Sequence, residues 1–165
     1  MALVSFHPTA ENQRGYRDAL GQFATGVAVV TTAHQGAPVG ITVNSFSSVS
    51  LAPPLVLWSL DKGSSKFDVF STQKDYAIHV LAADQAALSN HFSANGRDFT
   101  DIDWQADERG VPNLSGVLAR FDCHLAAIHE AGDHLILVGT VQHCALSDSL
   151  KKPLLFQGGA YQALK

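Results

Sequence analysis

Cysteine is scarce in this sequence of 165 residues, and charged residues of both signs are few. The two cysteines, Cys123 and Cys144, form no C-x-x-C pair, so the sequence suggests neither a zinc site nor a disulfide framework. Charged residues make up 16% of the chain and hydrophobic ones 46%, which is typical of a globular protein. The length suits a single domain over residues 1–165. The net charge of −4 and the pI near 6.0 argue against a nucleic-acid-binding protein, which would carry a basic patch.

Long apolar runs and the common catalytic fingerprints are also missing. No apolar run is long enough to span a bilayer, and no cationic N-terminal segment precedes an apolar one, so we expect a cytoplasmic protein without a membrane partner. The motifs G-x-G-x-x-G, G-x-x-x-x-G-K-[ST], H-E-x-x-H and G-x-S-x-G are absent. The spacing of the eight histidines places no three of them together, so no metal site is predicted. A phosphate-bearing ligand would have to be held by hydroxyls, backbone amides and a few lysines.

The distribution of apolar residues predicts a mainly β protein with short helices. Strands are expected over residues 27–33, 39–43, 55–60, 76–81, 118–130, 134–146 and 154–164, the last interrupted by Gly158-Gly159. Helices are expected over residues 11–24, 64–70 and 84–92, with Asp84 capping the third. The polar stretch 93–113 is expected to be a surface excursion. This element count favours a closed antiparallel barrel, because closure removes sheet edges; a β-sandwich is the alternative.

Two of these elements carry predictions about side-chain orientation. The first helix places Tyr16, Ala19, Leu20 and Phe23 at helical spacing, as in a helix with one apolar face. In the strand 118–130, alternation predicts that Asp122 faces away from the core.

The stretch from Gly40 to Pro54 is the most informative part of the chain. It begins as a strand, becomes rich in Ser, Thr and Asn, and ends at a double proline. Short hydroxyl and amide side chains can face a polar ligand closely, although the same residues also dominate ordinary turns. Because Phe46, Val49 and Leu51 alternate with the hydroxyls, we expect this segment to pack on the core and form a rigid ligand-binding wall.

Two further candidate sites lie at the ends of predicted strands. Residues 61–66 (Asp-Lys-Gly-Ser-Ser-Lys) follow a buried strand and open a short helix, where free N–H groups, the helix dipole, the Ser64 and Ser65 hydroxyls and a lysine would favour an anion. The alternative there is a plain helix cap. His134 follows the turn at residues 131–133, where it is either a ligand contact or a surface histidine.

Several motifs in order resemble those of the short-chain flavin reductase family, the reductase components of two-component flavin monooxygenases. They are Tyr16-Arg-Asp-Ala-Leu-Gly-Gln-Phe-Ala-Thr-Gly-Val27, Gly40-Ile-Thr-Val-Asn-Ser-Phe-Ser-Ser-Val-Ser50, Leu88-Ser-Asn-His-Phe92, Ala131-Gly-Asp-His134, and Pro153-Leu-Leu-Phe156 with Gly159 and Tyr161. The resemblance covers nearly the whole chain and is weakest between Ser93 and Asn113. It implies an FMN-binding split β-barrel of Greek-key type with flanking helices, usually a homodimer, that uses NADH or NADPH to reduce FMN or FAD.

The resemblance also assigns roles to individual residues. It implies that the isoalloxazine and ribityl chain lie along Thr42, Val43, Asn44, Ser45 and Ser48, and that Ser59, Ser64, Ser65 and Lys66 serve the phosphate end. Phe92 would border the flavin pocket, and His134 would contact the nicotinamide. Val43 and Ser93 stand where alanine is usual in the family, which leaves the choice between FMN and FAD open.

Such an activity agrees with the missing catalytic motifs. Hydride passes from the nicotinamide to flavin N5, so the cofactors supply the reactivity and the protein positions them. The resemblance further implies that reduced flavin leaves to serve a separate monooxygenase. The alternatives are a non-catalytic flavin-binding protein on the same barrel, and an oxidase acting on a pyridoxine phosphate, which would be expected to carry more basic residues.

Overall fold

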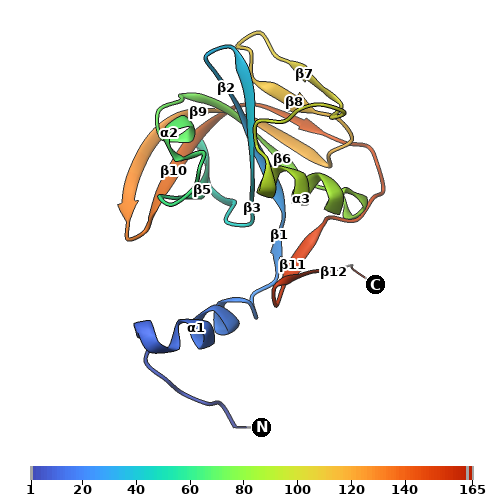
Figure 1. Cartoon of the computed structure of the whole chain (residues 1–165). Coiled ribbons are helices and arrows are strands. Elements are labelled where there is room, and N and C mark those ends of the chain that lie inside the picture. Colours follow the sequence, from blue (N-terminus) through green and yellow to red (C-terminus); the bar gives the residue numbers. More distant parts are fainter. Residues whose placement is uncertain (1, 163, 165) are drawn as a thin grey trace.

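Seven antiparallel strands form the main sheet of the protein, in the order β3-β2-β6-β9-β10-β5-β4. The computed structural model describes residues 2–162 and residue 164. The strands of this sheet are β2 (Ala28–His34), β3 (Ala37–Val43), β4 (Ser47–Leu51), β5 (Pro54–Asp61), β6 (Asp75–Val80), β9 (Ala119–Ala131) and β10 (His134–Leu146). They coil into a barrel (Figure 1). The mainly β class and the barrel are therefore confirmed, and the β-sandwich alternative is not observed.

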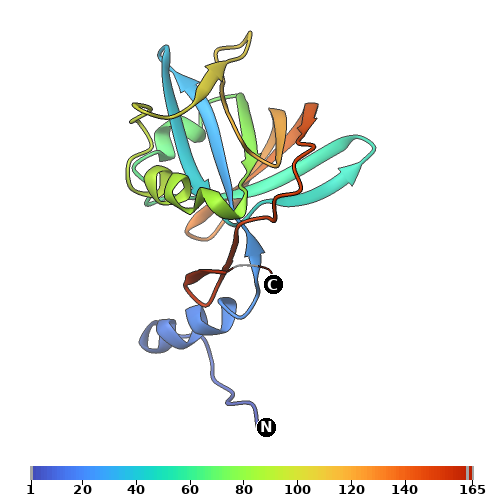
Figure 2. The same cartoon turned by 90° about the vertical axis from the view of Figure 1, so that its right-hand side faces the viewer.

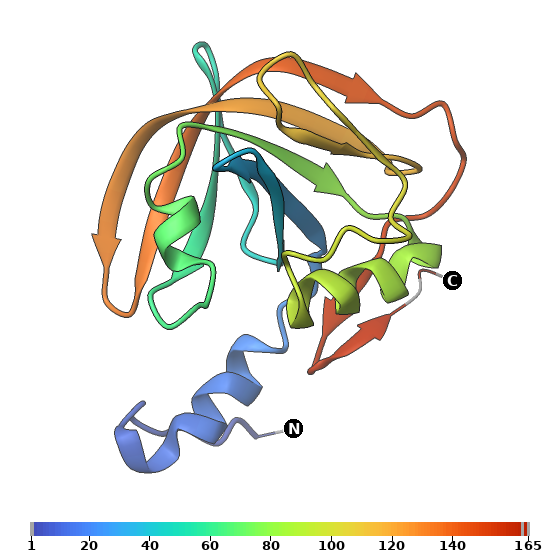
Figure 3. The same ribbon diagram turned by 45° about the horizontal axis from the view of Figure 1, so that its top comes forward.

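Smaller elements surround the barrel. Strands β1 (Thr25–Gly26), β11 (Leu155–Gln157) and β12 (Ala160–Gln162) form a second sheet, and β7 (Trp104–Ala106) pairs with β8 (Pro112–Leu114). The helices are η1 (Ala10–Asn12), α1 (Gln13–Leu20), α2 (Phe67–Phe70), η2 (Ala83–Gln85) and α3 (Ala86–Ala94). Figure 3 shows α3 lying between the barrel and the β11–β12 hairpin. No helix in the described part of the chain is long and apolar enough to cross a membrane.

The barrel is split rather than closed by backbone pairing. The hydrogen-bonded order of the main sheet ends at β3 on one side and at β4 on the other. A side chain bridges part of this gap, because the Ser59 N–H donates to Ser45 Oγ at 2.9 Å. The expectation of strict closure was wrong in this respect, and two sheet edges remain.

Local sequence signals explain the two main hairpins. Gln35 and Gly36 both have positive φ, at 52° and 79°, and join β2 to β3 in a tight turn. Gly132, with φ 65°, turns β9 into β10. β2 is buried along most of its length because Ala28 and Val30 face the barrel interior while Val29 faces a second core outside it.

The barrel interior is filled largely by aromatic and branched side chains. Trp58 packs edge-on against Phe70 and Tyr76, with ring centroids 5.4 and 6.0 Å apart. Burial raises the pKa of the nearby Cys123 thiol to about 12, so this cysteine stays protonated at neutral pH.

A second core lies outside the barrel, under α3 and the β7–β8 hairpin. Phe92 is fully buried there, and Phe99 and Trp104 continue the aromatic row from it. The expectation of a polar surface excursion over residues 93–113 was therefore wrong in part. Isolated apolar residues in this stretch pack against an outer sheet face, and no local periodicity predicts such a contact.

The N-terminal helix differs from its prediction in length and in burial. α1 ends at Leu20 rather than near Ala24, and none of its residues is buried. Leu20 and Phe23 are 57% and 77% exposed, and Tyr16 is 47% exposed. The helix stands away from the barrel (Figure 1), and its apolar side chains are left largely exposed.

The second half of the hydroxyl-rich stretch also differs from the prediction. Phe46 packs on the barrel core, but Val49 is 49% exposed and Leu51 is 95% exposed. These residues belong to β4, which forms the edge of the main sheet and extends away from it with β5 (Figure 2). Only the part of the stretch up to Phe46 therefore packs on the core.

Two polar residues were assigned to the wrong environment. Asp122 is buried, at 6% exposure, where Arg120 and His143 pair with its carboxylate at 2.9 and 3.1 Å. Asp84 is not the cap of a helix; it is exposed and pairs with Lys151 at 2.6 Å. The start of this helical segment is fixed instead by Gln85 Oε1, which accepts the Ala82 N–H at 2.9 Å.

His79 is a fully buried histidine that joins three strands, and it predicts a pH dependence of stability. Its Nδ1–H donates to Val29 O and its Nε2 accepts the Leu114 N–H, both at 3.1 Å, so the ring is neutral. Burial lowers the pKa of His79 from 6.5 to about 4. Between these values the unfolded chain binds a proton that the folded chain excludes. The free energy of unfolding should therefore fall by about 3 kcal/mol as the pH falls from 7 to 4.

Urea unfolding of the wild type and of His79→Asn across this pH range measures the effect. We expect the variant to be less stable than the wild type at pH 7. Its free energy of unfolding should nevertheless fall less between pH 7 and pH 4, because it has no imidazole to protonate. Parallel profiles for the two proteins would show that His79 does not cause the loss.

Candidate functional site

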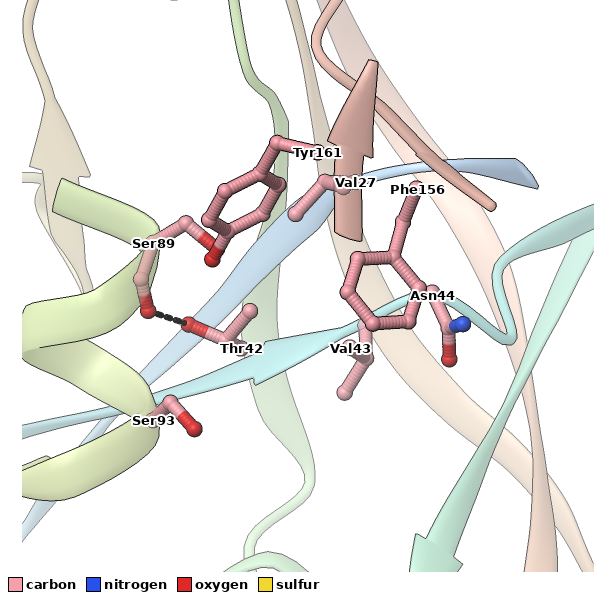
Figure 4. Close-up of a pocket in the computed structure, with 8 residues that line it drawn as sticks. All are labelled: Val27, Thr42, Val43, Asn44, Ser89, Ser93, Phe156 and Tyr161. Atoms are coloured by element: carbon pink, nitrogen blue, oxygen red, sulfur yellow. Dashed lines mark hydrogen bonds between the residues drawn. The ribbon is translucent and has the colours of Figure 1, made fainter. Parts of the chain in front are cut away.

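A pocket of about 190 Å³ opens between β3, α3 and the β11–β12 hairpin. Figure 4 shows its eight lining residues: Val27, Thr42, Val43, Asn44, Ser89, Ser93, Phe156 and Tyr161. Aliphatic and aromatic side chains contribute one part of the lining, and hydroxyl and amide groups contribute the other. None of the eight side chains is charged at neutral pH. Such a surface suits a flat ligand that has an apolar ring system and hydrogen-bonding edges.

The helix α3 connects the walls of this pocket. The Thr42 hydroxyl on β3 donates to the backbone carbonyl of Ser89 at 2.6 Å (Figure 4). The Tyr161 hydroxyl on β12 lies 2.8 Å from Ser89 Oγ and 2.9 Å from Asn90 Oδ1. Ser89 is fully buried between these partners. The hydroxyl-rich strand and the C-terminal hairpin are thus both anchored to one turn of α3.

Lys66 is a buried cation near the pocket. Its residue exposure is 8%, and its Nζ donates to the carbonyl of Ser93, a pocket residue, at 3.3 Å. No carboxylate pairs with it among residues 2–162. Burial lowers its pKa, because the charged ammonium loses solvation. An anionic group bound here would restore the stabilisation that the ammonium has lost.

The structure changes the physical basis of the predicted anion site. α2 begins at Phe67 rather than Ser64 and has only four residues. The preceding N–H groups are largely used internally: that of Gly63 donates to Asp61 Oδ1, that of Ser64 to Asp61 O, and that of Lys66 to Ser64 Oγ. The expectation of free N–H groups aimed at one spot was wrong. Lys66 and the hydroxyls of Ser64 and Ser65 are the groups that remain.

The other predicted flavin residues occupy different places. Ser45, which follows β3, and Ser59 on β5 lie together, joined by the hydrogen bond given above. Ser48 is on the exposed edge strand β4 and is not among the pocket residues. Phe92 is fully buried and lies against Gly40 on β3, so it supports the pocket wall from behind instead of bordering the pocket.

His134 lies at the end of the β9–β10 hairpin, as the sequence predicted. Its Nδ1 is 2.7 Å from Asp133 Oδ1, and this hydrogen bond lowers the pKa of the Asp133 carboxyl. The side chain is 40% exposed. Its strand neighbour is Asp61, and the next residue, Lys62, donates to Gly132 O at 2.8 Å. His134 is therefore held beside residues 61–66, the segment that carries Ser64, Ser65 and Lys66.

Sequence reasoning gave no role to five of the eight pocket residues. Val27, Ser89, Phe156 and Tyr161 stand in motifs of the family resemblance that assigned them no ligand contact, and Ser93 was noted only as a departure from the family. The available signals were the Gly158-Gly159 turn, which predicted a break in the last strand, and the serines spaced four residues apart on one helix. Neither signal shows that these segments meet β3.

A neutral amphipathic pocket with a buried lysine nearby, on a split barrel, would suit a flat ring with an anionic tail. The comparisons with known proteins identify the class of protein. Residues 20–165 match the family described as flavin reductase like domain. The chain belongs to this family.

The similar proteins include proteins named as reductases. The chain is 54% identical over 156 residues to "FMN reductase (NADH) SmoA" of Agrobacterium fabrum, covering 94% of this chain and 88% of that protein. It is 38% identical over 154 residues to "Flavin-dependent monooxygenase, reductase subunit HsaB" of Mycobacterium tuberculosis, covering 92% and 82%. The solved structure of Streptomyces globisporus NADH:FAD oxidoreductase SgcE6 in complex with NAD and FAD fragments superposes with a TM-score of 0.90 at 33% identity, covering 100% and 98%.

Proposed function

We propose that this protein is an NADH-dependent flavin reductase that reduces FMN or FAD and supplies the reduced flavin to a separate monooxygenase. The observation that carries the proposal is the neutral amphipathic pocket near the buried Lys66, which no carboxylate pairs in the described part of the chain. The pocket fits a flavin by its chemistry: Val27, Val43 and Phe156 offer apolar surface to the ring, and Thr42 and Asn44 offer hydrogen bonds to its edge. When bound, the flavin supplies the hydride acceptor and NADH supplies the hydride.

The residues of the chain then act by binding and orienting. Thr42, already donating to Ser89 O, keeps its oxygen lone pairs for a ligand donor, while Asn44 is exposed and offers both a donor and an acceptor. Lys66, Ser64 and Ser65 would hold a phosphate. His134 would contact the nicotinamide nucleotide through Nε2, since Nδ1 is held by Asp133. The pocket contains no carboxylate, histidine or cysteine, so the protein contributes positioning rather than proton transfer.

A turnover assay tests the proposal. Purified protein should oxidise NADH with many turnovers in the presence of added FMN or FAD. The loss of NADH absorbance, under anaerobic and aerobic conditions, measures the rate. Flavin binding without NADH oxidation would overturn the enzymatic function and leave a flavin-binding protein.

If Ser64 and Ser65 hold the phosphate, replacing them should affect the binding of FMN more than that of riboflavin. Replacing Ser64 and Ser65 together by Ala should weaken FMN binding by about tenfold and riboflavin binding much less, because only FMN carries the phosphate. Fluorescence titration with each flavin measures both constants. The double variant Ser147→Ala/Ser149→Ala, in an exposed segment away from the pocket, is the matched control. Equal losses for FMN and riboflavin would place the phosphate elsewhere.

We further propose a cytoplasmic homodimer in which each subunit is one domain of residues 1–165, and the exposed apolar side chains near the N-terminus support the dimer. Phe6, Leu20 and Phe23 are 44%, 57% and 77% exposed, and a second subunit would remove them from water. We expect sedimentation to show a dimer at micromolar concentration, and Leu20→Glu/Phe23→Glu to shift it to monomer. A fully active wild-type monomer would contradict the proposal.

A further inference from the structure

The β11–β12 hairpin forms one wall of the pocket without belonging to the barrel sheet. In the order β1-β11-β12, strand β12 is at the edge and pairs only with β11. The hairpin supplies Phe156 and Tyr161 to the pocket, and their rings pack edge-on with centroids 5.8 Å apart at 68°. The position of this aromatic wall therefore depends on contacts other than the main sheet.

The Tyr161 hydroxyl supplies one of these contacts, because it hydrogen-bonds to Ser89 and Asn90 on α3. A phenol has one proton, and the Asn90 carbonyl oxygen can only accept, so Tyr161 donates to Asn90 Oδ1 and accepts from Ser89 Oγ–H. Ser89 is fully buried, and a buried hydroxyl left without a partner is destabilising. These two hydrogen bonds thus hold β12 against the helix.

The opposite wall of the pocket depends on the same helical turn. Thr42 on β3 donates to Ser89 O, while Tyr161 binds the side chain of Ser89. Figure 4 shows Thr42 and Tyr161 on either side of Ser89, with the pocket residues Val27 and Phe156 beyond them. The spacing between the polar strand and the aromatic wall is therefore set through Ser89.

We propose that Tyr161 is a positioning residue of the reductase, whose hydroxyl fixes the aromatic wall relative to β3 and so sets the affinity for the flavin ring. The inference rests on the proposed function, because it takes the flavin as the ligand of this pocket. It assigns to the phenol hydroxyl an effect on the ring end of the ligand, in contrast to the effect of Ser64, Ser65 and Lys66 on the phosphate end.

Removing only the hydroxyl tests this assignment. In Tyr161→Phe, the dissociation constants of riboflavin and FMN should rise by the same factor, about tenfold. The KM for flavin should rise with them, by a larger factor than any fall in kcat. The visible absorption spectrum of the bound flavin should also shift, because the surroundings of the ring change. Tyr16→Phe, on the exposed helix α1, removes a hydroxyl from a tyrosine that is not among the pocket residues and should keep the wild-type constants.

Asn90→Ala removes the same hydrogen bond from an exposed position on the helix, which keeps the test valid if Tyr161→Phe folds poorly. The double variant should bind flavin as Tyr161→Phe does, since Asn90→Ala removes one of the two hydrogen bonds that Tyr161→Phe already removes. Unchanged flavin binding in Tyr161→Phe and Asn90→Ala, fully additive losses, or a loss confined to FMN would overturn the assignment. Failure of the proposed function is distinct, because the wild-type protein itself would then not oxidise NADH with flavin.

Discussion

Replacing Gly96 by Ala is expected to lower the free energy of unfolding by about 3 kcal/mol and to weaken FMN binding by more than tenfold. Gly96 is buried where the segment after α3 meets the edge of β3, and its carbonyl accepts the Gly40 N–H at 2.7 Å. A Cβ at this position would overlap the backbone oxygen of Gly40 and lie 2.7 Å from Lys66 Cε. The lysine can move, but the backbone cannot move without opening the contact between β3 and α3.

Urea unfolding and FMN titration measure both effects. Gly15→Ala is the matched control, because a Cβ there would meet only the Phe6 ring at an ordinary distance of 3.5 Å and would favour the helix α1. A Gly96→Ala protein as stable as Gly15→Ala, with wild-type FMN affinity, would show that the packing of α3 on β3 tolerates an added methyl group.

Replacing His134 by Ala is expected to lower kcat/KM for NADH by tenfold to a hundredfold, about 1.4–2.7 kcal/mol, while flavin affinity stays nearly unchanged. His134 is on the rim near residues 61–66 and does not line the pocket. Its Nε2 is available to a ligand, since Nδ1 is held by Asp133. Removing the ring should therefore weaken the nicotinamide nucleotide contact and leave the flavin contacts intact.

Steady-state kinetics with NADH varied at saturating flavin measure this effect. His143→Ala is the matched control, because His143 is also on β10 and binds an aspartate through Nδ1, at 3.1 Å, but its strand neighbour is Asp122, outside residues 61–66. An unchanged kcat/KM in His134→Ala, or a loss only in flavin binding, would mean that His134 is a surface histidine without a role in the reaction.

Features that depend on residues adjacent in the sequence could be predicted from the sequence. The Gln35-Gly36 turn, the Gly132 turn and the Gly158-Gly159 turn each mark a hairpin that the structure contains. The position of His134 at a hairpin end followed from the second of these turns. The resemblance to the flavin reductase family added the split barrel and the activity, which no local pattern specifies.

The remaining features depend on contacts between distant parts of the chain. Asp122 is buried where Arg120 and His143 pair with its carboxylate, and alternation alone cannot show that these two side chains lie beside it. Phe92 has the apolar character of a pocket residue and of a core residue alike, and only the close approach of α3 to Gly40 places it in the core. Tyr161 gained a role because the second sheet brings it to α3 across more than 70 residues of sequence.

The two edges of the split barrel also have unequal consequences for association between molecules. At β3 the segment after α3 covers the edge, and Gly40 N–H is already paired with Gly96 O. At β4 the residues Ser47–Leu51 carry no charge, and a bulge between Ser48 and Ser50 interrupts an otherwise exposed strand. Charged side chains commonly protect such an edge from pairing with strands of other molecules. Aggregation of the concentrated protein should therefore begin at β4, and a lysine introduced there would improve its colloidal stability without touching the pocket.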